Sequence, residues 1–456
     1  MMIVSKQHQI FFDFLRFCIG SDSDILFSLK EADWKELYAI AKKQCLVGVL
    51  FDGIKKLPAE HVEMEKELLL QWMAESQMLE KANVRLNDAA IQVSEWFRKK
   101  GFRTCILKGQ GNALMYPNPY SRTPGDIDIW VEGGDKRVIS FVRSISPHEK
   151  ACYHHIEFPS YKGKDIEVHY RPSFLLCFWH DRKLQKYYER VKEEQFSHRV
   201  MLGEQGEIAI PTVEFNLIFQ LTHIYAHLMN EGIGLRQLLD YYFVVCNFYK
   251  VYQTSTNHSA SFSNHPVPLS KEGSTFSPSP SSSGSGDVLR CSEPLRYKDG
   301  GASKLSPGCA GWDRLEMSGE MSSDCADASS AVAHSSFAAS SSSAALDRVQ
   351  KELKELGLWK FAGAIMYIMQ EVFGMPASRL IVPPNEKYGK FVLNEVLEAG
   401  NFGKHDERNC FGKSQLGHNL QRVYRDMRLV RYFPAEALSE PIFRTWHFFW
   451  RLKHRR

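Results

Sequence analysis

The chain lacks the sequence features of a secreted or membrane-spanning protein. Its 456 residues include ten cysteines, but no two of them form a C-x-x-C pair, and they lie mainly in apolar surroundings such as those of Cys105 and Cys246. This pattern favours reduced thiols over a disulfide framework. The first residues lack the apolar core and small-residue cleavage site of a signal peptide, and no uncharged run of about 18 apolar residues occurs. We therefore expect a cytoplasmic protein without a membrane span.

The sequence also lacks a strong charge of either sign. Its net charge is +4 at pH 7, which neither requires nor excludes a nucleic-acid partner. Hydrophobic residues make up 44% of the chain and aromatic residues 12%. At this length such a composition predicts a large buried core and two or more domains.

Two aspartates stand in a strand pattern at residues 126–131. Asp126 and Asp128 alternate with apolar residues, downstream of a glycine turn at Lys108 and Gly109. Because side chains alternate along a strand, both carboxylates are expected on one face, about 6–7 Å apart. Carboxylates this close repel each other unless a cation separates them. Mg²⁺ is the expected cation because it prefers oxygen ligands. The alternative is a solvated edge strand or turn.

A third carboxylate follows in a second strand pattern. In residues 164–171 the polar side chains of Asp165, Glu167 and His169 alternate with apolar ones, and residues 153–171 read as a hairpin. If this strand lies beside the first, Glu167 faces the two aspartates. Three acids could then bind two metal ions about 3.5–4 Å apart, the arrangement used for in-line phosphoryl or nucleotidyl transfer.

These motifs resemble a known family. Residues 107–131 contain L-K-G, Y-P and R-x-x-G-D-I-D-I-W-V, and residues 166–171 read I-E-V-H-Y-R. They resemble the uncharacterised bacterial nucleotidyltransferase family of the DNA-polymerase-β-type superfamily. Gln110 stands where the superfamily usually has Gly or Ser. Further similar stretches are D-W-K-E-L-Y-A-I-A-K-K-Q near the N-terminus, G-L-R-Q-L-L-D at 234–240 and A-G-N-F-G-K at 399–404.

The resemblance implies roles for the acids and for the turn. Asp126 and Asp128 match the metal-binding pair, Glu167 matches the third acid and Gly109 matches the turn glycine. These three acids are therefore the expected catalytic and metal-binding residues, holding two Mg²⁺ ions, with Mn²⁺ as a possible substitute.

Four residues are predicted to bind the nucleotide. Gly109 permits close backbone approach to a phosphate. Lys108 supplies a positive charge beside the turn, or else is a solvated strand end. Arg122 contacts a phosphate or braces the carboxylates. His169 orients Glu167 or the substrate, or else is a hydrogen-bonded structural histidine.

The predicted fold is α+β, with a small mixed nucleotidyltransferase sheet embedded in a largely helical protein. Strands are expected at 102–107, 126–132 and within 153–171, and the pattern becomes mainly helical again from about residue 177. Low-complexity serine-rich sequence predicts a disordered insertion. The expected regions are N-terminal helices at 1–100, the sheet core at 101–175, helices at 176–250, the insertion at 251–345 and C-terminal helices at 346–456.

Two features of the helical regions leave alternatives open. His223 and His227 have helical spacing but lack the glutamate of H-E-x-x-H, so packing near the cleft is favoured over zinc binding. Arg236 and Asp240 are four apart, which predicts an intrahelical pair; the alternative is an Arg236 that faces the cleft and a phosphate.

The basic, aromatic tail from Arg422 onward is typical of an RNA- or membrane-surface segment. A terminal helix whose aromatic face packs on the body while its arginines face water is favoured.

The leading functional hypothesis is a metal-dependent enzyme that transfers a nucleoside monophosphate from an NTP such as ATP to an unknown acceptor, whether RNA, protein or small molecule. The competing hypothesis is a non-catalytic protein that keeps the fold and binds a nucleotide, RNA or protein. A toxin or protein-modifying transferase would differ from the first only in its acceptor.

Overall fold

Helices dominate the structure. The computed structural model describes residues 5–22, 29–204, 206–260, 342–408 and 415–454. Residues up to Thr256 and from Ser342 onward belong to one structural unit. The helices that precede the first strand are α1 (Lys6–Ile19), α3 (Trp34–Lys43), α4 (Val47–Ile54) and α5 (Lys66–Lys99). The later helices are α6 (Gln110–Ala113), α7 (Gly134–Ile145), α8 (Phe178–Ser197), α9 (Val213–Asn230), α10 (Leu235–Ala260), α11 (Ser342–Glu355), α12 (Trp359–Glu371), α13 (Glu386–Ala399), α14 (Gln415–Leu429) and α15 (Pro434–Lys453).

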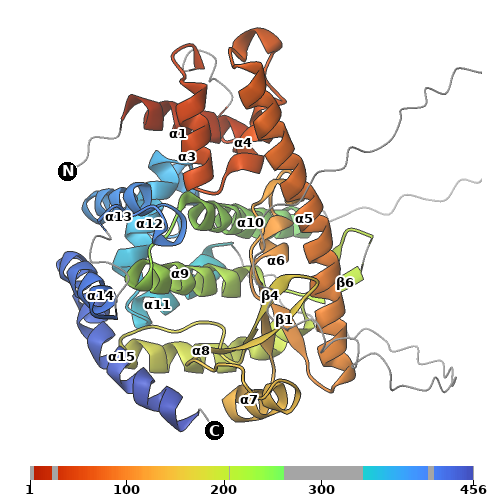
Figure 1. The fold of residues 1–456 in the computed structure, drawn as a ribbon, viewed down its shortest axis with the longest axis vertical. Coiled ribbons are helices and arrows are strands. Elements are labelled where there is room, and N and C mark those ends of the chain that lie inside the picture. The colour runs from red at the N-terminus through yellow and green to blue at the C-terminus, as the bar shows by residue number, and fades with distance from the viewer. Residues whose placement is uncertain (1–4, 23–28, 205, 261–341, 409–414, 455–456) are drawn as a thin grey trace, which may run out of the picture. The chain divides into compact units, whose positions relative to one another are not determined.

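A four-stranded mixed sheet lies among these helices (Figure 1). Its strands are β1 (Thr104–Ile106), β2 (Ile127–Val131), β3 (His155–Tyr161) and β4 (Lys164–His169), in the order β1-β2-β4-β3. The β2–β4 pair is parallel and the other two pairs are antiparallel. The predicted α+β fold, with a small mixed sheet inside a largely helical protein, is therefore confirmed.

One face of the sheet is apolar and is covered by α5 and α7. Phe158 of β3 packs on Phe97 of α5 with ring centroids 5.5 Å apart, and Phe97 contacts Phe141 of α7 at 6.0 Å. The buried strand residues of this face are Ile127, Ile129, Ile156, Ile166 and Val168. Each such side chain stabilises the fold by about 1.5–3 kcal/mol relative to an exposed one. Because strand side chains alternate, the polar residues between them are directed to the opposite face.

The β3–β4 hairpin closes where the sequence predicted a turn. Tyr161 pairs with Lys164 across a two-residue loop formed by Lys162 and Gly163. Both loop residues have positive φ, 49° and 72°. Two positive φ angles in succession give the turn whose twist matches that of the flanking strands, and glycine at the second position makes it accessible.

A second hairpin was not predicted. Strands β5 (Arg199–Leu202) and β6 (Gly206–Ala209) form a two-stranded antiparallel sheet. The described structure beyond residue 177 is mainly helical, as expected, with this hairpin as an unpredicted addition. Two four-residue strands are too short for an alternating pattern to stand out from the helical sequence on either side.

The predicted serine-rich insertion, residues 251–345, lies mostly outside the described residues. At its edges, α10 continues to Ala260 and α11 begins at Ser342.

Among the described helices, none combines the length and apolar character needed to cross a membrane. The six cysteines that the structure describes are all free thiols.

Candidate metal and nucleotide site

The polar face of the sheet brings the three predicted acids together. Asp128 on β2 and Glu167 on β4 are direct Cα partners in the parallel ladder, so their side chains lie on the same face. Asp126 precedes β2 and is two residues from Asp128, which directs it to that face as well. One oxygen from each acid lies within 4.8 Å of the others. We call Asp126, Asp128 and Glu167 the acid triad.

Two cationic side chains balance the buried carboxylate of Asp128. Lys108 Nζ lies 2.9 Å from Asp128 Oδ1, and His169 Nε2 lies 3.0 Å from the same oxygen. Burial alone would raise the pKa of Asp128, but these two neighbours hold it below its usual value. Burial would conversely lower the pKa of His169, and the carboxylates of Asp128 and Glu167 instead raise it to about 9. The structure therefore places Lys108 against the triad, where it also contacts His223 Nε2 at 2.7 Å.

Like charges within the triad repel one another. The negative charge of Asp128, followed by burial, raises the pKa of Asp126. Asp126 is also the exposed member, whereas Asp128 is only 3% exposed. A divalent cation among three carboxylates would relieve this repulsion, and hard cations take such oxygen ligands. The donor set thus fits Mg²⁺.

Gly109 forms the turn between β1 and α6. Its φ of 54° and ψ of −106° are open to glycine but strained for residues with a Cβ atom. A Cβ atom there would lie 3.9 Å from the carbonyl oxygen of Asp126, so the turn runs beside the triad. The adjacent Gln110 points away from it and donates to Asn87 of α5.

Arg122 pairs with Asp240 of α10 rather than with the acid triad. Its Nε and one terminal nitrogen each donate to an Asp240 oxygen at 2.8 Å, and both residues are at least 95% buried. Tyr116 also donates to Asp240, at 2.7 Å. The predicted intrahelical pair between Arg236 and Asp240 was therefore wrong: a residue 118 positions away supplies the partner of Asp240. A phosphate contact by Arg122 remains a prediction.

Arg236 instead faces the cavity beside the triad. It donates to the carbonyl of Thr123 at 3.1 Å and lies over the Phe402 ring at 5.6 Å. Its Nε is buried and makes no hydrogen bond to any described residue. The stretches at 234–240 and 399–404, which both resemble the nucleotidyltransferase family in sequence, therefore lie against each other. A Cβ atom at Gly403 would come within 2.0 Å of the Glu231 carbonyl oxygen, so only glycine permits this approach.

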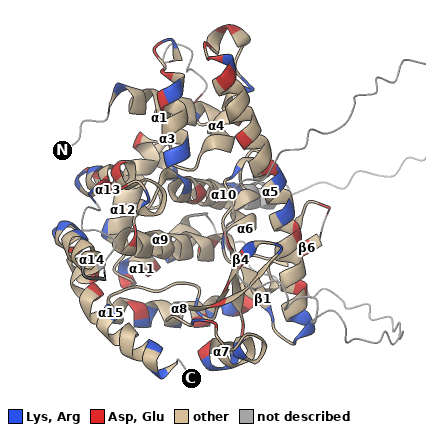
Figure 2. Ribbon diagram, viewed as in Figure 1, with Lys and Arg blue, Asp and Glu red and all other residues tan. Residues whose placement is uncertain are grey.

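A cavity of about 400 Å³ opens over the acid triad. Its lining combines the triad with α9, α10 and the C-terminal helices, and it includes three arginines that we call the arginine wall: Arg422, Arg444 and Arg451. Basic positions recur along α14 and α15 (Figure 2). Arg444 Nη1 is buried without a hydrogen-bond partner among the described residues, which leaves a donor for an anionic ligand.

The arginine wall was missed in the sequence. Only part of the aromatic face of the tail packs on the body: Phe443 and Trp446 contact Tyr153 with ring centroids 5.6 and 5.3 Å apart, whereas Phe448 and Phe449 are 50% and 63% exposed. Arg422 and Arg451 are exposed, as expected, although they also line the cavity, whereas Arg444 is only partly exposed. His223 and His227 line the same cavity, with their Nε2 atoms 3.1 Å apart, as the packing alternative predicted.

Two adjacent histidines at the beginning of β3, one just before the strand and one at its first residue, were also overlooked. His154 and His155 line the cavity, and His155 is the Cα partner of His169 across the β3–β4 ladder. Burial, followed by the positive charge of His169, lowers the pKa of His155 to about 4, so its imidazole is neutral at pH 7. The alternation of polar residues in β3 was the available signal.

A carboxyl pair formed by Asp426 and the cavity-lining Glu440 predicts a pH effect on stability. Burial and the neighbouring Glu440 raise the pKa of Asp426 to about 7, although Arg425 and Arg444 oppose the shift. The folded state therefore binds more protons than the unfolded state between about pH 4 and 7, and its stability should fall as pH rises through that window. In Asp426→Asn the decrease in unfolding free energy over this pH range should be smaller than in the wild type by about 1–2 kcal/mol, a value that allows for the partial exposure of the side chain. Urea denaturation of the wild type and the variant at pH 5 and 7.5 measures this difference. The same pH dependence of stability in both proteins would contradict the prediction.

Comparison with known proteins gives one match. No curated protein and no solved structure matches the chain significantly. Residues 30–252 match the model of a family described as uncharacterised nucleotidyltransferases. The matched range contains the whole acid triad and the six strands of the described residues, and it ends before the 399–404 stretch and the arginine wall. The predicted resemblance to a nucleotidyltransferase family is therefore confirmed over residues 30–252, slightly less than half of the chain.

Proposed function

We propose that the protein is a metal-dependent nucleotidyltransferase that moves a nucleoside monophosphate from an NTP to an acceptor. One observation carries the proposal: the acid triad and the arginine wall line the same cavity. The family match supports nucleotidyl transfer in general. The triad and the wall add the two complementary charges that a metal–triphosphate complex needs.

The acid triad is the proposed metal site. Asp126, Asp128 and Glu167 offer three carboxylate oxygens within 4.8 Å of one another, which fits hard divalent cations. When bound, such cations supply Lewis-acid polarisation and activation of the attacking hydroxyl. Lys108 and His169 hold the Asp128 carboxylate in place, at 2.9 and 3.0 Å. Fixed orientation of this kind keeps the reorganisation cost low during transfer.

The arginine wall and Arg236 are the proposed triphosphate contacts. Arginine presents planar, fixed donors that suit phosphate oxygens. Arg444 Nη1 and Arg236 Nε are buried and have no hydrogen-bond partner among the described residues. A buried unsatisfied donor costs about 1–3 kcal/mol, which a bound phosphate would relieve. Lys108 would reach a phosphate only by moving from Asp128.

A non-catalytic nucleotide-binding protein is the second candidate. The observation that favours it is the pairing of Asp128 Oδ1 with both Lys108 and His169. That pairing lowers the need for a metal ion at this oxygen. Such a protein would still bind an NTP against the arginine wall, but would not cleave it.

Two labelled substrates test the proposal. The protein is incubated with an extract and with each NTP carrying label on either its α- or its γ-phosphate. We expect transfer of the α-label to an acceptor, with pyrophosphate release, only when a divalent metal is present. Transfer of the γ-label would overturn the proposal in favour of phosphoryl transfer. Retained NTP binding without transfer of either label would overturn it in favour of the non-catalytic candidate.

A further inference from the structure

Nitrogen donors lie directly beside the acid triad. The ladder pairs His155 with His169 and Asp128 with Glu167, so these four side chains share the polar face of the sheet. Three of them, His155, Glu167 and His169, offer ligand atoms within 4.8 Å of one another. This group overlaps the triad only at Glu167.

Glu167 is spaced from the two histidines as one metal ligand is from another, and His169 Nε2 would exchange its 3.0 Å contact with Asp128 Oδ1 for the ion. Glu167 Oε2 lies 3.4 Å from His155 Nδ1 and 3.4 Å from His169 Nε2. A good N–H···O hydrogen bond is shorter, at about 2.9 Å. Two ligand atoms that each lie about 2.0–2.1 Å from a tetrahedral zinc ion are about 3.3 Å apart. The two separations therefore match neighbouring ligands of one ion.

We propose that His155, Glu167 and His169 form a second metal subsite that selects a zinc-class transition ion over Mg²⁺. Imidazole nitrogens favour such ions, whereas Mg²⁺ takes oxygen ligands. Two histidines and one carboxylate are also a ligand set of catalytic zinc sites, which keep an open position. Here that position faces the cavity. The subsite stands independently of the proposed transferase activity, because it rests on donor type and spacing.

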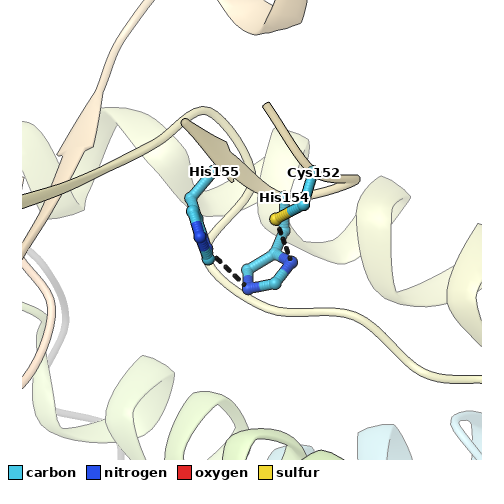
Figure 3. Close-up of side chains that lie close together, drawn as sticks. All are labelled: Cys152, His154 and His155. Carbon is cyan, nitrogen blue, oxygen red and sulfur yellow. Dashed lines mark hydrogen bonds between the residues drawn. The ribbon is translucent and has the colours of Figure 1, made fainter. Parts of the chain in front are cut away.

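The surroundings of the subsite hold the histidine rings in place and add further donors. The second nitrogen of His169, Nδ1, lies 3.4 Å from the carbonyl oxygen of Arg171, the kind of partner that orients metal-bound imidazoles. His154 Nε2 lies 3.0 Å from His155 Nδ1, the atom that would bind the ion, so this contact would open on binding; Cys152 Sγ lies 3.6 Å from His154 Nδ1. Figure 3 shows the His154 ring between the other two side chains. A thiol and a third imidazole thus stand within reach, and both favour zinc over magnesium.

Metal analysis of the whole protein tests the subsite. The protein is purified without a polyhistidine tag, stripped with chelator, and equilibrated with Zn²⁺ or Co²⁺ in millimolar Mg²⁺. We expect one tightly held zinc per chain, and at least about a 100-fold loss of Zn²⁺ affinity in His155→Ala. Asp126→Asn is the matched control, because it alters the triad but leaves the subsite intact. Its zinc content should equal that of the wild type.

Two results would overturn the inference: a wild-type protein that releases zinc in millimolar Mg²⁺, or a His155→Ala variant that binds zinc as the wild type does. If that variant fails to fold, the Co²⁺ spectrum of the wild type decides. Intense visible bands of four- or five-coordinate cobalt support the subsite, and the weak bands of an octahedral oxygen site refute it. Absence of label transfer would refute the proposed function while leaving the zinc result unchanged.

Discussion

Asp128→Asn should lower the rate of pyrophosphate release by about 10³-fold or more, which corresponds to roughly 4 kcal/mol of lost transition-state stabilisation. Asp128 lies at the centre of the triad and is 3% exposed. Asparagine has nearly the same shape as the Asp128 side chain but lacks the negative charge with which a carboxylate binds a metal ion. It also leaves Lys108 and His169 facing a neutral amide.

Asp165→Asn is the matched control for this prediction. Asp165 lies on β4, the strand that carries Glu167, but it is exposed and does not line the cavity. The control should retain the wild-type rate, and thermal melts should show that both variants fold. A rate within threefold of wild type for Asp128→Asn would contradict the role given to Asp128.

Loss of either partner of the Arg122–Asp240 pair should destabilise the protein by about 3–5 kcal/mol. The pair is buried and bidentate, so removing one side chain leaves an uncompensated charge in a buried position. Arg122→Met would strand the Asp240 carboxylate, which would keep only Tyr116 as a hydrogen-bond donor. Asp240→Leu would strand the guanidinium. Arg122 begins the segment that leads to Asp126, so activity should fall along with stability.

Chemical denaturation of a double-mutant cycle measures this effect. The double variant Arg122→Met/Asp240→Leu should lose much less stability than the sum of the two single variants, because it buries no isolated charge. The exposed pair of Lys6 and Glu31, with side chains 66% and 61% exposed, provides the control. Lys6→Met should change stability by less than about 1 kcal/mol. An equally small change for Arg122→Met would contradict the prediction.

The sheet and the acid triad were predictable because both follow from local alternation. The period of two in residues 126–131 and 164–171 assigned Asp128 and Glu167 to one face of their strands. A parallel ladder in register then made them direct neighbours. The turn at Lys162 and Gly163 was predictable for the same reason, since it depends on adjacent residues only.

Contacts between distant segments were not predictable in this way. Helical spacing favoured Arg236 as the partner of Asp240, but Arg122, 118 positions earlier, binds it. No local pattern records which of two arginines is nearer in the folded chain. The same limit applies to the arginine wall, since an amphipathic helix shows which of its faces is basic but not whether that face meets solvent or a cavity.

Calorimetric titration with a non-cleavable NTP analogue, with and without Mg²⁺, tests most directly whether the acid triad binds a divalent cation together with the nucleotide. The wild type should bind the analogue at least about 10-fold more tightly with Mg²⁺, a gain of roughly 1.4 kcal/mol. The double variant Asp126→Ala/Asp128→Ala should lose that gain while keeping its metal-free affinity. Equal Mg²⁺-dependent binding by the two proteins would show that the cation is held elsewhere and would contradict the metal site.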